Sequence, residues 1–379
     1  MYKSDFVRQL QTPGGTIQLR RSIQVDYTLA VILLILCGVG LLIIYSATGQ
    51  SVFYVKRQLT FILAGFFIMI LFAQFPQRFW ERWALIVYLV GVIALVGVLH
   101  AGIEINGAQR WLDLKFTRLQ PSELMKICVP LMVSAYIAKR AIPPSLKHVS
   151  AAVILISVPV LLVLRQPDLG TALLISATGF FVLFLAGIKR RYLLGAFILA
   201  LAALPSLWFF VMLDYQKQRV LTLLNPQHDK LGAGWNIIQS TTAIGSGGWS
   251  GKGWTQGTQS QLNFLPESHT DFIIAVLAEE FGLIGVLILC MLYTMLIARC
   301  LYIGLNSLTM FGRLMAGSVA YTFFIFVIVN LCMVSGLLPV VGAPLPLISY
   351  GGTAIVTLFA GFGIIMSIGN ESKKSRSVS

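Results

Sequence analysis

Ten stretches of the chain are long, apolar and almost free of charged side chains, so each is able to cross a lipid bilayer. A helix needs about 20 mostly apolar residues to span the hydrocarbon core. The stretches lie roughly at 27–46, 58–75, 83–101, 121–138, 148–165, 169–188, 192–213, 271–298, 314–334 and 351–369. Hydrophobic residues make up 57% of the chain and charged residues only 11%, too few to cover a soluble fold. The sequence therefore predicts an all-α, polytopic integral membrane protein with ten transmembrane helices.

The distribution of charge predicts how the chain is oriented in the membrane. The net charge is +14, a value also typical of nucleic-acid-binding proteins. If the N-terminus is cytoplasmic, most of the 28 Lys and Arg residues fall in cytoplasmic segments, whereas most of the 14 Asp and Glu residues fall towards the outer face. The basic residues are thus explained by topology, which argues against nucleic acid as a partner. We expect a multi-pass protein with both termini in the cytoplasm.

The chain divides into two short tails and one transmembrane domain. Residues 1–25 and 371–379 are predicted to be flexible cytoplasmic tails, and residues 26–370 form the domain. Connections between spans are short except for a long external loop at about 214–270, which is rich in Gly and Trp. Glycine turns let a backbone approach a ligand closely and offer N–H groups to anions; the composition fits a flexible surface loop equally well. The five cysteines show no metal-ligand spacing, so no zinc site or disulfide framework is indicated.

Asp271 stands at the predicted start of the eighth span, at the end of the long loop. Ser268 precedes it by the spacing of a capping box, and acids favour helix N-termini, so spacing alone favours a helix cap. The alternative is a general base at the membrane–water boundary, whose pKa the helix start would lower. The neighbouring His269 could bind metal or substrate, but a lone histidine is usually only a polar neighbour. Glu279 and Glu280 lie about 12 Å deeper, where acids are usually functional or paired.

Two further charged groups occur at span ends. Glu123 and Lys126 open the fourth span three residues apart, so they share a helix face and can pair. They form either a structural ion pair near the interface or a pair that shapes a polar cavity. Arg165 and Asp168 lie in a tight external turn, where Asp168 could simply cap the following helix.

A series of motifs in a fixed order resembles the SEDS family (shape, elongation, division and sporulation proteins), most closely its RodA branch. The motifs occupy residues 107–111, 120–123, 165–171, 234–240, 243–248, 265–271, 279–280, 330–339, 344–346 and 349–352. Single motifs are weak signals, but the whole set covers the chain from about 27 to 369 and is highly specific. Residues 253–262 are similar to the elongation branch rather than to the division branch.

The resemblance implies ten membrane helices, in agreement with the spans counted above, and a peptidoglycan glycosyltransferase. Such an enzyme polymerises lipid II on the outer face of the cytoplasmic (inner) membrane during cell elongation, with its active site facing the periplasm or exterior. In the family the aspartate at the position of Asp271 is catalytic, and the Glu123–Lys126 pair lies in a functionally important central cavity. The implied partner is a class B penicillin-binding protein, a transpeptidase that crosslinks the new glycan.

The residues present fit this chemistry. The attacking sugar 4-hydroxyl needs a base, and we expect Asp271 to be that base in an inverting displacement. The lipid pyrophosphate already leaves well, so no second acid is required, but its departing charge requires cations. Candidates are Arg110, Lys126, Arg165, Lys217 and Arg219, or a divalent cation (Mg²⁺ or Mn²⁺) held partly by the substrate, with no metal ligands assigned. The other residues expected at the substrate site are Glu123, Asp168, Glu267, His269 and Ser349.

Two other functions also fit ten helices with buried acids. One is a transporter that flips lipid II between leaflets, and the other is a non-catalytic scaffold of the cell-wall elongation complex. An aspartate at an external helix start favours chemistry at the surface over alternating access. A scaffold would remain functional without the Asp271 carboxylate.

Overall fold

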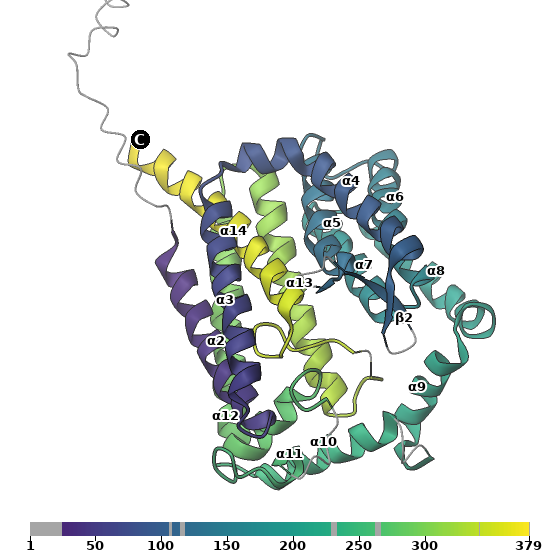
Figure 1. Cartoon of the computed structure of the whole chain (residues 1–379). Helices are drawn as coiled ribbons and strands as arrows, with labels where there is room; N and C mark the ends of the chain where they lie inside the picture. Colours follow the sequence, from purple (N-terminus) through teal and green to yellow (C-terminus); the bar gives the residue numbers. More distant parts are fainter. Residues whose placement is uncertain are drawn as a thin grey trace, which may run out of the picture.

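The computed structural model of the chain describes residues 25–105, 108–113, 118–228, 233–261, 267–340 and 342–378. In this part of the chain a helix occupies each of the predicted spans (Figure 1). These helices are α2 (Tyr27–Ala47), α3 (Val52–Ala73), α4 (Gln77–Ala101), α5 (Pro121–Ile137), α6 (Leu146–Arg165), α7 (Leu169–Leu185), α8 (Arg190–Ser206), α12 (Ile273–Leu305), α13 (Met310–Val334) and α14 (Gly352–Val378). Of the described helices, 7 are long and apolar enough to span a membrane, while α5, α7 and α8 have 17 residues each. The predicted all-α membrane fold is confirmed.

Helices α13 and α14 form the centre of the bundle. About two thirds of the apolar window of each is buried, 61% and 67%, against 22% for α3. In Figure 1, α13 lies between one group formed by α2, α3, α12 and α14 and a second group formed by α4 to α7. Fully buried phenylalanines fill the contact between the central helices, among them Phe323 of α13 and Phe362 of α14, whose ring centroids are 5.7 Å apart.

Polar side chains cap the starts of several helices. One of these caps, at Asp168, was predicted from the sequence. The Asp168 carboxylate accepts a hydrogen bond from Thr171 N at 3.1 Å and caps α7, which confirms the predicted cap. Asp26 caps α2 through Leu29 N at 3.0 Å and also binds Arg299 of α12. Such caps satisfy backbone N–H groups that have no partner within the helix.

Most of the predicted long loop is helical in the described residues. It contains α9 (Asp214–Leu224), a short 3₁₀ turn (Pro226–His228), α10 (Ala233–Gly247) and α11 (Thr258–Gln261). Helix α8 ends in a π-helical turn (Leu207–Val211), and none of its described side chains is buried. Figure 1 shows α8 and α9 reaching out from the bundle before α10 returns and packs against α12. The alternative of a flexible surface loop is therefore wrong for these residues.

The glycines at the end of α10 and just after it bring this segment against a break in α12. Gly282 has φ 65° and ψ −164°, which interrupts the helix. Backbone hydrogen bonds of 3.0 to 3.1 Å join the two segments there: Leu283 N to Gly248 O, Ile284 N to Trp249 O, Lys252 N to Glu279 O and Gly253 N to Glu280 O. A Cβ on Gly247 would lie 2.0 Å from Ala278 O, and one on Gly251 would lie 2.1 Å from Glu280 O. Only glycine permits so close an approach of two backbones.

Two features were not predicted from the sequence. A small antiparallel sheet, β1 (Ile103–Ile105), β2 (Ala108–Asp113) and β3 (Arg118–Leu119), connects α4 to α5. Helix α14 continues to Val378, so the predicted flexible tail 371–379 is helical through that residue. Glu371 within this extension accepts a hydrogen bond from Gln77 N at 3.1 Å, which ties the end of α14 to the start of α4. Nearly all of the predicted N-terminal tail, residues 1–25, lies outside the described residues.

Candidate active site

Asp271 lies in a turn at residues 267–272 that precedes α12. The helix begins at Ile273, and its N-cap residue, Phe272, makes no side-chain cap. Ser268 does not close a capping box, because its hydroxyl donates to Ala47 O at 3.2 Å. The predicted cap is therefore wrong, and the Asp271 carboxylate is not used to start the helix.

The turn around Asp271 is closed by its own residues. Glu267 adopts a positive φ of 57°, and its carbonyl oxygen accepts hydrogen bonds from Thr270 N at 3.1 Å and Phe272 N at 3.3 Å. The Thr270 hydroxyl donates to the Glu267 carboxylate at 2.6 Å. A non-glycine residue with positive φ is uncommon and persists where surrounding contacts hold it. The exposed Glu267 carboxylate is thereby kept on the same turn as Asp271.

The segment between α13 and α14, residues 335–351, holds the turn from the other side. The Ser349 hydroxyl donates to Thr270 O at 2.6 Å, and Tyr350 N donates to His269 O at 2.9 Å. Gly342 lies beside the catalytic candidate, because a Cβ on this glycine would be 3.5 Å from Asp271 Oδ2. Its φ of +77° is a conformation that glycine adopts without strain.

Burial and, to a lesser extent, the charge of Glu267 raise the pKa of Asp271 to about 6, and the charge of Arg219 opposes both effects. The prediction of a lowered pKa is wrong, because the helix starts beyond Asp271 and desolvation outweighs the influence of the helix start.

Burial also lowers the pKa of His269, with Glu267 acting in the opposite direction. The His269 ring packs against Tyr54 and Tyr350, with centroids 5.5 and 5.9 Å away.

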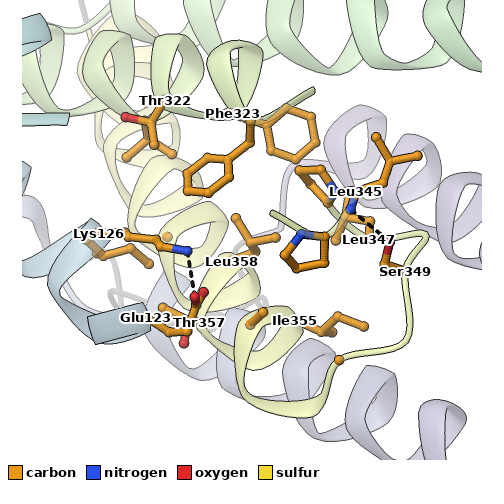
Figure 2. Close-up of a pocket in the computed structure, with 18 residues that line it drawn as sticks. Glu123, Lys126, Thr322, Phe323, Leu345, Leu347, Ser349, Ile355, Thr357 and Leu358 are labelled. Carbon is orange, nitrogen blue, oxygen red and sulfur yellow. Dashed lines mark hydrogen bonds and ion pairs between the residues drawn. The ribbon is translucent and has the colours of Figure 1, made fainter. Parts of the chain in front are cut away.

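A largely apolar cavity with an empty volume of about 700 Å³ lies among α5, α13, α14 and residues 344–351 (Figure 2). At one side of it Lys126 Nζ lies 2.6 Å from Glu123 Oε1, so the predicted pair forms. Lys126 Nζ also lies 4.4 Å from the centroid of the Phe326 ring, a cation–π contact. In the view of Figure 2, Ser349 lines the side opposite this ion pair.

A second cavity, with an empty volume of about 540 Å³, lies between α9, the start of α7, β2 and the segment after α13. Arg110 donates to Pro167 O at 2.7 Å, and its guanidinium lies 3.6 Å from the Asp168 carboxylate. Across the cavity Arg219 donates to Val340 O at 3.0 Å. Two guanidinium groups from distant parts of the sequence therefore face one cavity.

The segment between α13 and α14 contacts all three parts of this region. Val340 lines the second cavity, Gly342 lies beside Asp271, and residues 344–351 line the first cavity. Neither cavity lining includes Asp271 itself. One short segment thus places the carboxylate next to an apolar cavity and next to a cationic cavity.

Other predicted residues lie outside this arrangement. Arg165 is exposed at the end of α6 and Lys217 is half-buried on α9, and neither lines one of the two cavities described above. Glu279 is fully buried and accepts hydrogen bonds from Lys252 Nζ at 2.7 Å and Thr258 Oγ1 at 3.0 Å, which is a structural role. Glu280 accepts one from the Ser46 hydroxyl. The described residues contain no group of three or more His, Cys, Asp or Glu side chains able to hold a metal ion, so the divalent cation stays a prediction.

In the sequence Asn330 stood only at the start of the motif 330–339, without a role of its own, and Gly342 was not marked at all. The Asn330 amide donates to Asp271 O at 2.9 Å and to Ala343 O at 2.7 Å. A polar residue within an apolar span is a signal that could have pointed to Asn330. No comparable signal marks Gly342, because its significance depends on a contact with a residue far away in the sequence.

The chain is similar to known proteins over most of its length. The FtsW/RodA/SpoVE cell cycle protein family model matches residues 27–374. The chain is 54% identical over 351 residues to the peptidoglycan glycosyltransferase MrdB of Escherichia coli, covering 93% of this chain and 95% of MrdB. It is 37% identical over 350 residues to a probable peptidoglycan glycosyltransferase FtsW of Geobacter sulfurreducens, covering 88% of this chain and 92% of that one.

Two solved structures are similar over nearly the whole chain. One is the rod shape determining protein RodA of Thermus thermophilus, with a TM-score of 0.70, 28% identity and coverage of 93% of this chain and 98% of that chain. The other belongs to a study of how a peptidoglycan synthase complex coordinates polymerization and crosslinking, with a TM-score of 0.82, 30% identity and coverage of 93% and 99%.

Proposed function

The chain belongs to the FtsW/RodA/SpoVE family of cell cycle proteins, and from that premise we propose that it polymerises lipid II into glycan strands during cell elongation. The observation that carries the proposal is the 54% identity with a peptidoglycan glycosyltransferase over 93% of the chain. A pure scaffold would not need the Asp271 carboxylate, and the place of this residue at the start of a span favours chemistry at the surface over alternating access. The proposed active site faces the outside of the cytoplasmic membrane, with both termini in the cytoplasm.

In the proposed reaction Asp271 is the general base. Its carboxylate takes the proton from the acceptor 4-hydroxyl as that oxygen forms a bond to the anomeric carbon of the donor sugar. The bond from this carbon to the lipid pyrophosphate breaks, and undecaprenyl pyrophosphate leaves with the electron pair, which inverts the configuration. A pKa of about 6 suits this role, because the group is mostly ionised at neutral pH yet more basic than an ordinary aspartate.

The two cavities suit different parts of lipid II. We expect the apolar cavity beside Glu123 and Lys126 to receive lipid, since its lining is dominated by apolar side chains. Arg110 and Arg219 in the second cavity are the proposed partners of the departing pyrophosphate, because guanidinium groups bind phosphate oxygens well. A divalent cation, if used, would take part of its ligands from that pyrophosphate.

The proposed partner is a class B penicillin-binding protein. Support comes from the relative studied in a complex that both polymerises and crosslinks peptidoglycan. A glycan strand made at the outer membrane surface would then pass directly to a transpeptidase.

The proposal is tested by polymerisation of lipid II in detergent by the purified protein with its transpeptidase partner. Asp271→Asn should lower the rate by about 10²-fold or more, the usual contribution of a positioned base. Asp214→Asn is the matched control, because Asp214 is exposed at the start of α9. Normal polymerisation by Asp271→Asn would refute the assignment of the base. Because detergent micelles have no leaflets to cross, glycan made by the wild type also distinguishes a polymerase from a transporter.

A further inference from the structure

One fully buried side chain of α13 joins the backbone of Asp271 to the segment that covers its carboxylate. Asn330 has an exposed fraction of 0%. Its Nδ2 donates one hydrogen bond to Asp271 O at 2.9 Å and a second to Ala343 O at 2.7 Å. Both acceptors are carbonyl oxygens, so the amide must present its NH₂ group to them.

The surroundings of Asn330 make this arrangement costly unless it serves a purpose. Phe326 on the preceding turn of α13 and Ala343 are buried in one apolar cluster that also contains Leu174. Asn330 Oδ1 is buried and has no hydrogen-bond partner among the described residues. Buried polar atoms without partners are rare in native proteins and destabilise the fold, so each calls for an explanation.

The second bonded carbonyl explains why the position matters for chemistry. Ala343 directly follows Gly342, the residue whose Cβ position would be 3.5 Å from Asp271 Oδ2. A single amide therefore fixes the peptide of Asp271 and the peptide next to Gly342 relative to each other. Displacement of either peptide changes how the Asp271 carboxylate is oriented and how far it is shielded from water.

We propose that Asn330 is a positioning residue for glycan polymerisation, which acts by holding the Asp271 turn and the Gly342–Ala343 backbone in one fixed arrangement. The inference rests on the proposed role of Asp271 as the base. Asn330 lines neither of the two cavities, so its proposed effect on the reaction is exerted through Asp271. Misplacement of a catalytic group by about 1 Å is able to cost on the order of 10²-fold in rate.

The test uses two substitutions in the full-length protein with its transpeptidase partner. Asn330→Leu keeps the approximate volume and removes both donors, whereas Asn330→Asp keeps the shape and replaces the NH₂ group by oxygen. Both should lower kcat by about 10- to 100-fold with an unchanged KM for lipid II. In Asn330→Leu the acid limb of the kcat/KM pH profile should also move to lower pH, because a loosened turn admits water to a carboxylate whose pKa is raised to about 6, chiefly by burial. Asn330→Asp is judged by kcat alone, because an ionised carboxylate beside Asp271 would itself raise the pKa of Asp271.

Ser318→Ala is the matched control on the same helix. Ser318 is fully buried and donates to Thr178 O of α7 at 2.8 Å, so its loss also removes a buried hydrogen bond of α13. The thermal stability of Ser318→Ala should fall, whereas its kcat per folded molecule and the acid limb of its pH profile should stay as in the wild type. A wild-type kcat and an unmoved acid limb in folded Asn330→Leu, or a wild-type kcat in folded Asn330→Asp, would overturn the proposal.

A third variant keeps the test decisive if the Asn330 variants insert poorly. Gly342→Ala places a methyl group beside Asp271 in a strained conformation and should lower kcat by disturbing the same contact. Combined with Asn330→Asp, its effect should be less than additive, and full additivity would contradict a shared mechanism. Asp271→Asn is assayed in parallel. If Asp271→Asn is active, both the role of Asp271 as the base and the positioning role of Asn330 are refuted. If Asp271→Asn is inactive but the Asn330 variants are fully active, only the positioning role is refuted.

Discussion

At the scale of single residues, the charges around Asp271 should set the pH dependence of polymerisation. A base is active when ionised, so kcat/KM should rise with pH and level off above a pKa of about 6. Glu267→Gln removes a repelling charge, lowers the pKa of Asp271 and moves the acid limb to lower pH. Arg219→Gln removes an attracting charge and moves the limb to higher pH. Rates measured between about pH 5 and 8 check this, and a shift of both variants in one direction would contradict it.

The same carboxylate should make the active protein less stable at neutral pH. In the folded protein the pKa of Asp271, about 6, lies above the ordinary 3.8, so folding favours the protonated carboxyl. The resulting contribution to the free energy of unfolding is complete below pH 3.8 and is lost as the pH rises through 6. At about 1.4 kcal/mol per unit this shift costs roughly 3 kcal/mol at most, less where solvent screens the group. Asp271→Asn should therefore raise Tm at neutral pH and raise it less under acidic conditions. An equal Tm gain at both pH values would indicate an effect other than charge.

Sequence and structure differ in what they reveal about individual residues. Asp271, Glu123 and Lys126 could be predicted because charged groups at span starts stand out in an apolar chain. Asn330 could not be assigned a role, since its bond to Asp271 joins residues 59 positions apart. The raised pKa of Asp271 was also beyond prediction, because burial depends on the fold around the turn.

At the scale of elements, one ion pair adds to the backbone hydrogen bonds that join the segment after α10 to the break in α12. Glu279 is fully buried, and Lys252 Nζ lies 2.7 Å from its carboxylate. Lys252→Met leaves that charge without its cation, which typically destabilises a protein by about 3–5 kcal/mol. Tm of the purified protein should fall sharply. Lys252→Arg should keep most of the stability, and adding Glu279→Gln to Lys252→Met should restore much of it; failure of that restoration would argue against the ion pair as the cause.

The helices that cross the membrane were predictable, because the lipid requires a long apolar run of sequence for each of them. The spans appeared as apolar runs with few or no charges because a membrane helix must be apolar over most of its length. Helices α9 and α10 were missed because they are short and mix polar with apolar residues. The break at Gly282 was also missed, since it is stabilised by backbone contacts with a segment distant in sequence.

At the scale of the whole molecule, the start of α12, the end of α13 and the start of α14 meet at one end of the bundle. The turn of Asp271, the segment that carries Gly342 and the wall of the apolar cavity all come from these termini. Helices α13 and α14, each largely buried, therefore support the site. Helices α8 and α9 lie at the periphery, and α9 brings Arg219 to the site from there.

The orientation of this bundle is open to a direct test. If the Asp271 end faces outward, a cysteine at exposed Gln256 should react with a membrane-impermeant maleimide added to intact spheroplasts. A cysteine at exposed Lys147, at the start of α6, should react only after permeabilisation. Both substitutions are made in a chain whose own five cysteines are replaced, so any signal comes from the introduced thiol. The opposite labelling pattern would place Asp271 in the cytoplasm, where it could not polymerise lipid II at the outer surface. It would also mean that the positive-inside rule fails for this chain.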